Sequence, residues 1–513
     1  MTELPPNVRP PTPEEIREHA ATHFMSLSEA EVEDFAAAIE GTLDGYERLD
    51  ALPEPTQDRQ FTERDPGYRP DDEEDPLNAV VRKCRVPGAS TGPLSGYEVG
   101  LKDNVSLAGV EMTCGSKLFD GYVPERDATV VTRLLEAGAT ITAKLNMEDM
   151  AFSGSGELSA TGPVLNPHDE DHIAGGSSSG SIAAVMNGDV DVAIGGDQGG
   201  SIRIPASWSG GVGHKPTHSL VPYTGVVGLG HTYDHVGPMA RDVTDCARVL
   251  DAIAGKDPDD PRQGAVPTEA GGYLDGLGDD PSDVTVGVLA EGFGHEASEE
   301  GVDERVQDAL DDFEAAGATV EEVSVPMHDD GLAIWNGVVI EETRALVRDE
   351  GVGHFGKGHY DTQFAETFGR ARRAGADDYL TTLKLTLVLG EYLAEQYHGR
   401  YYAKAQNLAR ELAERYDEAL ADVDVLAMPT TPQTAHERRD HLTRLEVIER
   451  ALNMLDNTAP FDVTGHPAIS VPAGESDGLP VGLMFVGERF EDATVLGAGR
   501  AFEASVGWDW QED

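Results

Sequence analysis

Apolar side chains recur every three or four residues near the N-terminus, which is the spacing of an amphipathic helix. Thr12 followed by Pro13 and two glutamates marks a helix start with proline at its first position. Ser28 and Glu31 form a capping-box pattern, S-x-x-E, ahead of a second apolar stripe. The stripe consists of Val32, Phe35, Ala36, Ile39, Leu43 and Tyr46. The pattern therefore predicts two helices within the first 50 residues.

The stretch from Pro53 to Pro76 is rich in Pro, Asp, Glu and Arg, and its composition predicts a linker. We therefore expect two parts: an N-terminal helical segment with its linker at 1–75 and a catalytic domain at 76–513. The first part lacks convergent polar groups. We expect it to serve packing or dimerisation, with a homodimer as one assembly.

From about residue 77 the pattern changes to short apolar runs that alternate with helical periodicity. The predicted strands are 97–101, 140–144, 190–194, 284–289, 319–325 and 423–428, and the predicted helices are 128–137, a helix opening at 181–186, 302–316 and a stretch at 379–420. Residues 255–283 are dense in Gly, Asp and Pro and predict a surface connection. Alternation of this kind is typical of an α/β layered fold.

Charge is unbalanced in sign. The chain has 94 Asp+Glu against 38 Lys+Arg, a formal net charge of −56, and only nine of its basic residues are lysines. This field repels polyanions, so we expect no direct contact with nucleic acid or with an anionic membrane surface. At about 1 M salt the Debye length falls to about 3 Å and screens the self-repulsion. The hypothesis is a halophilic source, with an acidic mesophilic protein as the alternative.

The sequence has no run of 18 apolar residues and no basic segment followed by an apolar one at its start, so no membrane span or secretory signal is expected. Cys84, Cys114 and Cys246 are an odd number without C-x-x-C spacing. They argue against a disulfide framework and a zinc ribbon, and for a reducing, cytoplasmic location. We expect no cofactor and no metal.

Chemistry is concentrated at 175–217, where 43 residues include eleven glycines and several serines. Glycine lets backbone amides approach a ligand, and serine supplies hydroxyls that become nucleophiles when a base is near. A flexible linker is the plain alternative. It is disfavoured because the apolar runs at 182–186 and 190–194 require burial, so the glycine and serine clusters bracket core elements.

Three interpretations of this segment compete. A phosphate loop at GGDQGGS lacks the lysine of a P-loop and the spacing of a dinucleotide fingerprint. A nucleophile elbow matches Gly176–Gly180 as G-x-S-x-G, yet the polar stretch at 166–172 replaces the buried strand that an elbow needs. In the third, Ser201 is the nucleophile. The backbone amides of Gln198, Gly199 and Gly200 then form an oxyanion hole.

The segments GGSSSGS, GGDQGGSIRIPAS and GVGHKPT resemble the amidase signature family, whose pattern is close to GGSSGGS, G(S/T)DTGGSIR-P and G-KPT. The resemblance covers about residues 80–505 and includes GLKDNV around Lys102. It implies a Ser–cis-Ser–Lys triad of Lys102, Ser177 and Ser201, separated by 75 and 24 residues. It also implies the amidase signature fold, a layered mixed β-sheet covered by helices.

The implied relay has a physical requirement. A lysine at its ordinary pKa of about 10.4 is protonated at pH 7 and cannot act as a base, so Lys102 must be buried to lower its pKa. Asp103 follows it directly and, in a strand, points to the opposite face. The cis peptide at Ser177 comes from the resemblance alone.

Other polar residues near the motif receive supporting roles. Ser178, Asp197 and Arg203 are expected in substrate binding or in support of the site, with a salt bridge between the last two. His168, His172 and His214 lack metal-ligand spacing, Cys114 lacks a catalytic partner pattern, and Lys144 and Lys215 compete with Lys102 as the base.

Two activities share the signature: hydrolysis of free amides, and glutamine-dependent amidation by the GatA-type component of glutamyl-tRNA(Gln)/aspartyl-tRNA(Asn) amidotransferase. That component holds the carboxylate of glutamine with an arginine, whose segment matches the arginine-free 385–390 here, and an expected acidic residue falls on Leu455. These losses favour an apolar acyl pocket. We therefore expect an amidase that releases ammonia from a small carboxylic monoamide through a Ser201 acyl-enzyme. A catalytically inactive scaffold on the same fold is the non-enzyme alternative.

Overall fold

The computed structural model describes residues 8–267, 270–354 and 356–506. The chain divides into two compact units, Met1–Gln60 and Phe61–Asp513. In the first unit, α1 (Pro13–Thr22) and α2 (Glu29–Asp50) both begin with capping boxes, at Thr12 and at Ser28, as the sequence predicts. The described part of this unit buries only three apolar side chains, those of Ile16, Ala20 and Val32.

The second unit is built on one sheet of twelve strands in the order β1-β2-β4-β3-β5-β7-β6-β11-β12-β10-β8-β9. The strands are β1 (Asp65–Tyr68), β2 (Val80–Pro87), β3 (Glu98–Lys102), β4 (Thr140–Leu145), β5 (Val192–Asp197), β6 (Val212–Lys215), β7 (His235–Ala240), β8 (Thr285–Leu289), β9 (Thr319–Val323), β10 (Val425–Pro429), β11 (Ala468–Ser476) and β12 (Leu479–Val486). Parallel pairs join β3 to β4 and β5, and join β8 to β9 and β10. The remaining pairs are antiparallel.

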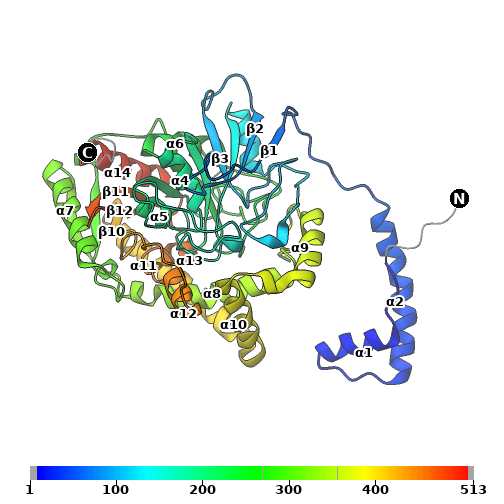
Figure 1. Ribbon diagram of the computed structural model, residues 1–513. Helices are drawn as coiled ribbons and strands as arrows, with labels where there is room; N and C mark the ends of the chain where they lie inside the picture. The colour runs from blue at the N-terminus through cyan, green and yellow to red at the C-terminus, as the bar shows by residue number, and fades with distance from the viewer. Residues whose placement is uncertain (1–7, 268–269, 355, 507–513) are drawn as a thin grey trace. The chain divides into compact units, whose positions relative to one another are not determined.

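Helices of this unit cover the sheet (Figure 1). They are α3 (Thr129–Glu136), α4 (Ser179–Asn187), α5 (Arg203–Trp208), α6 (Val243–Ile253), α7 (Glu300–Ala316), α8 (Gly331–Arg348), α9 (Thr362–Gly375), α10 (Thr381–Tyr397), α11 (Arg400–Leu420), α12 (Arg444–Leu452), α13 (Pro460–Thr464) and α14 (Asp492–Ser505). The expected α/β fold, a layered mixed sheet covered by helices, is confirmed. Among the described residues, no helix is long and apolar enough to cross a membrane.

Each face of the sheet packs against its own helices because successive side chains of a strand point to opposite faces. In β10, Val425 and Ala427 join a core cluster with α3, α6, α7 and α14. Leu426 and Met428 join a different cluster with α8, α11 and α13. Short apolar strands with both faces buried read as continuous apolar runs, which is why periodicity identified them.

The structure changes two of the sequence-based boundaries. The predicted linker contains β1, which pairs with β2, so the compact units meet at residues 60 and 61 rather than at 75 and 76. The helical stretch at 379–420 is two helices, α10 and α11. The break lies at His398 and Gly399, which both adopt left-handed backbone conformations, and a non-glycine residue pays a steric cost there.

Candidate active site

The predicted triad lies where β3 and β5 end side by side. The two strands are parallel, with Leu101 opposite Ile194, so their carboxyl ends reach the same edge of the sheet. Lys102 is the last residue of β3, and Gly196 lies near the end of β5. Lys102 Nζ donates to Gly196 O at 3.0 Å. This parallel pairing is the reason that residues 94 positions apart in sequence meet.

Lys102 also reaches Ser177. Its Nζ donates to Ser177 Oγ at 2.8 Å, and the Gly176–Ser177 peptide bond is cis. The side chain of Lys102 is fully buried. Burial lowers the pKa of Lys102 to about 7, although the charges of Asp197, Glu148 and Asp234 act in the opposite direction. The arrangement places an amine that is substantially neutral at pH 7 in contact with a serine hydroxyl.

Ser201 belongs to the loop between β5 and α5, and this loop lies against the loop of Ser177. The Ser178 N–H donates to Ser201 O at 3.2 Å. Ser178 Oγ donates to Gly196 O at 3.1 Å and accepts from the Gly196 N–H at 3.2 Å. Ser178 thus joins the two loops through hydrogen bonds on both sides, and it does not line the pocket described below.

Asp197 encloses the Ser201 loop. Its carboxylate accepts from the Gly200 N–H at 2.6 Å and from the Ile202 N–H at 3.0 Å, which are the residues on either side of Ser201. Arg203 donates to both carboxylate oxygens, each at 3.0 Å, and also to Asp462 at 2.8 Å. Burial alone would raise the pKa of Asp197, but Arg203 holds it well below its usual range. The expected Asp197–Arg203 salt bridge is present and fully buried.

Two distant side chains hold the carbonyl groups of the same loop. Trp335 Nε1 donates to Gln198 O at 2.7 Å, and Thr458 Oγ1 donates to Gly199 O at 2.6 Å. Because a peptide plane is rigid, fixing a carbonyl also fixes the N–H that follows it. The Gly200 N–H is already used by Asp197. Within the described chain, the N–H groups of Gln198 and Gly199 donate to no protein acceptor.

The loop requires glycine at two positions. Gly200 has φ of +136°, and a Cβ at this residue would lie 2.4 Å from Thr458 Oγ1. At Gly199 a Cβ would lie 2.9 Å from Trp335 Cζ2. These contacts leave no room for a side chain and explain the glycine pair ahead of Ser201.

A mainly apolar pocket lies over this loop. Its lining consists of Ala151, Phe152, Ser153, Gly154, Gln198, Gly199, Ser201, Leu229, Trp335, Val339, Leu452 and Leu455. None of these residues carries a formal charge. Leu455, on which the expected acidic residue falls, is therefore part of the pocket. The arginine-free segment 385–390 lies in α10 and contributes no lining residue.

The competing polar residues have other partners. Lys144 Nζ donates to Val105 O and lies 3.5 Å from Asp103, whose carboxylate also accepts from the Thr113 N–H and Oγ1. Lys215 Nζ donates to His466 O at 2.5 Å. Neither lysine contacts Ser177.

The remaining candidates lie outside the pocket lining. His168 pairs with Ser209 O at 2.9 Å, His172 with Asp169 at 2.9 Å and His214 with Asp492 at 3.2 Å. Cys114 is buried in an apolar cluster.

Sequence reasoning missed Trp335, Thr458 and most of the apolar lining. Trp335 and Thr458 lie 137 and 259 residues from the carbonyl groups that they hold. No local pattern marks such residues, because only the tertiary fold brings them to the loop. Leu455 alone was indicated in advance, by its position in the resemblance.

Comparison with known proteins agrees with this geometry. The family model "Amidase" matches residues 77–496. The chain belongs to the amidase family. It is 43% identical over 498 residues to an enantioselective amidase of Rhodococcus rhodochrous, covering 94% of this chain and 93% of the relative. It is 41% identical over 429 residues to the GatA-type component of the glutamyl-tRNA(Gln) amidotransferase of Natronomonas pharaonis, covering 83% and 99%.

Among solved structures, the native peptide amidase of Stenotrophomonas maltophilia matches with a TM-score of 0.70 and 30% identity, covering 84% of this chain and 89% of that one. The amidase fold is thus shared along with the sequence. The protein is an amidase, a hydrolase that acts on carbon–nitrogen bonds.

Proposed function

We propose that this amidase hydrolyses small aliphatic or aromatic carboxylic monoamides to the carboxylate and ammonia. The observation that carries the proposal is the absence of a charged side chain from the described lining of the pocket at Ser201. An acyl group that is itself charged or strongly polar would lose hydration there without a compensating partner. An apolar acyl group instead gains from contact with Phe152, Trp335 and Leu455.

In the proposed reaction, neutral Lys102 accepts a proton from Ser177 while one of its N–H groups keeps its contact with Gly196 O. Ser177 in turn takes the proton of Ser201, whose Oγ attacks the amide carbonyl. The N–H groups of Gln198 and Gly199 stabilise the oxyanion, and the Asp197 contact positions Gly200 beside them. The proton returns to the leaving nitrogen, ammonia departs, and water hydrolyses the Ser201 ester through the same relay.

Ammonia release from benzamide and propionamide tests this function. We expect turnover by the purified chain alone and loss of about 10³-fold or more in kcat for Ser201→Ala, since the nucleophile is removed. Thr386→Val is a matched control, because it removes a buried hydroxyl of α10 that bonds only within its helix, at Thr382 O. Equal ammonia release by Ser201→Ala and the native chain would contradict the proposal.

The alternative is the GatA-type component of glutamyl-tRNA(Gln)/aspartyl-tRNA(Asn) amidotransferase, and the Natronomonas relative supports it by identity. The uncharged pocket argues against it, because the α-carboxylate and ammonium of glutamine would need charged partners. Glutaminase activity that appears only with added partner proteins, without turnover of benzamide, would favour the alternative. A protein inert in both assays and unlabelled by a fluorophosphonate would favour the scaffold.

The setting of the enzyme is also a proposal. All three cysteines are free and buried, which supports a reducing, cytoplasmic location. The net charge of −56 supports a halophilic source.

A homodimer through the N-terminal helices is supported by the apolar side chains that these helices expose, including Phe24 at 99% and Leu49 at 62%. Removal of residues 1–60 should therefore leave a monomer in light scattering with native kcat. A truncated chain that keeps the oligomeric state of the full-length protein would contradict this role.

A further inference from the structure

A second pocket lies beside the catalytic one and is not used by the proposed reaction. Neighbouring residues separate the two: Met150 lines the second pocket and Ala151 the catalytic one, and Gly228 and Leu229 divide in the same way. Tyr223 lines the second pocket, and its hydroxyl accepts from Gln198 Nε2 at 3.0 Å. Ser201 is not part of this lining. The two pockets are therefore neighbours with different walls.

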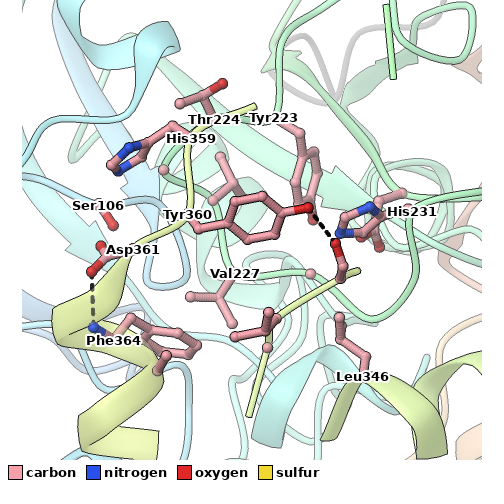
Figure 2. Close-up of a pocket in the computed structure, with 18 of the residues that line it drawn as sticks. Ser106, Tyr223, Thr224, Val227, His231, Leu346, His359, Tyr360, Asp361 and Phe364 are labelled. Atoms are coloured by element: carbon pink, nitrogen blue, oxygen red, sulfur yellow. Dashed lines mark hydrogen bonds between the residues drawn. The ribbon is translucent and has the colours of Figure 1, made fainter. Parts of the chain in front are cut away.

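The body of the second pocket is apolar and aromatic. Figure 2 shows Val227, Leu346, Tyr360 and Phe364 among its lining side chains, with the ring of Tyr360 extending toward the side of His231. The Tyr360 hydroxyl donates to Gly353 O at 2.7 Å, which holds the ring across the pocket. The empty volume is about 1060 Å³, the open mouth included, so a ring-sized molecule fits.

The charges of the lining are mainly negative. Five carboxylates line it, those of Asp234, Asp259, Asp260, Glu350 and Asp361, against one guanidinium in the described lining, that of Arg262. Arg262 is already engaged: it pairs with Asp260 at 2.7 Å and lies 4.6 Å from the centre of the Tyr223 ring. This stacking shows that the aromatic wall accepts a cation, while the remaining carboxylates disfavour an anion.

Asp361 offers the clearest contact for a ligand. It caps helix α9, where one carboxylate oxygen accepts from the Phe364 N–H at 2.8 Å, as Figure 2 shows. Its carboxylate has no basic partner in the described chain, whereas Asp260 pairs with Arg262, and Glu350 pairs with Arg372 at 2.6 Å. A charge that is fixed by a cap but not neutralised is suited to an ammonium group.

We propose that the second pocket binds a small organic ammonium ion, with its apolar body among Val227, Leu346 and Phe364 and its charge facing Asp361. The lining selects against carboxylates, including the acid that the proposed reaction would release. Because Tyr223 contacts Gln198, an occupant that shifts this ring also shifts a side chain of the Ser201 loop.

Calorimetric titration with benzylammonium chloride tests the site. The Ser201→Ala chain is used, since binding does not depend on catalysis. We expect saturable 1:1 binding, with benzyl alcohol and benzoate at least 10-fold weaker. Asp361→Asn keeps a helix cap but removes the charge, and it should weaken benzylammonium binding at least 10-fold. Asp242→Asn, the same change at the cap of α6 outside the pocket, should bind like the parent chain.

Two further variants locate the ligand. Leu346→Trp fills the second pocket and should abolish binding, whereas Leu455→Trp fills the catalytic pocket and should not affect it. No saturable binding, unchanged affinity in Asp361→Asn, a preference for benzoate, or loss of binding in Leu455→Trp would each overturn the proposal. These results are independent of ammonia release, so the two proposals fail separately.

Discussion

Lys102 shows how burial can change the chemistry of one residue. In water its ammonium group is protonated at pH 7, but within the protein its pKa falls to about 7. The nearest groups are a serine hydroxyl and a carbonyl oxygen rather than a carboxylate. A direct carboxylate partner would have stabilised the charged form and removed the base. Lys144 illustrates the contrast, because it is equally buried but lies beside Asp103.

The pH profile should follow this lysine. Since the proposed base is the neutral amine, kcat/KM should fall as the pH drops through about 7 and level off above it. Lys102→Met should lower kcat/KM by about 10²- to 10⁴-fold, the usual contribution of a general base. Its residual activity should lack the decline below pH 7. The measurement is ammonia release between pH 5 and 10, with the melting temperature as the control for folding. Persistence of the same acid limb in Lys102→Met would assign it to another group.

At the scale of elements, the site depends on the pairing of β3 with β5 and on the loop between β5 and α5. Parallel strands end at one edge, which brings Lys102 to Gly196. The loop is then held from three directions, by Asp197 at its start, Trp335 on α8 and Thr458 before α13. Donors that are fixed before the reaction need no reorganisation when negative charge develops on the substrate oxygen.

Thr458→Val tests the alignment of the loop. The change keeps the shape of the side chain but removes the hydroxyl that holds Gly199 O. We expect kcat to fall about 10- to 100-fold, less than the loss of a whole oxyanion-hole donor, with little change in KM. Steady-state kinetics and thermal melts measure both effects, and Thr386→Val should leave kcat at the native value. An increase in KM alone would mean that Thr458 shapes the pocket rather than the donors.

At the scale of the whole molecule, a net charge of −56 must be accommodated by a single folded chain. Mutual repulsion among so many carboxylates destabilises the compact state at low ionic strength. Buried charged groups at the site, in contrast, are neutralised locally, as in Arg203 with Asp197 and Asp462. Salt therefore acts on the surface more than on the site.

Stability should accordingly depend on salt. We expect the melting temperature to rise by several degrees between 0.1 and 2 M KCl, because screening reduces the repulsion between surface carboxylates. NaCl at equal ionic strength should give a similar rise, since screening depends on ionic strength rather than on the cation. A melting temperature that does not change over this range would contradict both the argument and a halophilic setting.

The sequence alone determined the elements and the chemistry-bearing segments. Strands buried on both faces leave continuous apolar runs, and the capping boxes at Thr12 and Ser28 fix helix starts, so both are readable locally. The glycine and serine pattern at 175–217, together with Lys102, indicated the family and the candidate triad. The extent of the linker and the break at His398 were read less well, because they depend on one strand pairing and on two backbone conformations.

Only the tertiary structure decided what surrounds these residues. Whether Lys102 is neutral depends on its burial and on which groups lie near Nζ, and the sequence does not state either. The grip of Trp335 and Thr458 on the loop, the uncharged pocket and the second pocket at Asp361 all join residues far apart in the chain. Such contacts arise from the packing of the helices against the sheet, and a local pattern of residues carries no information about them.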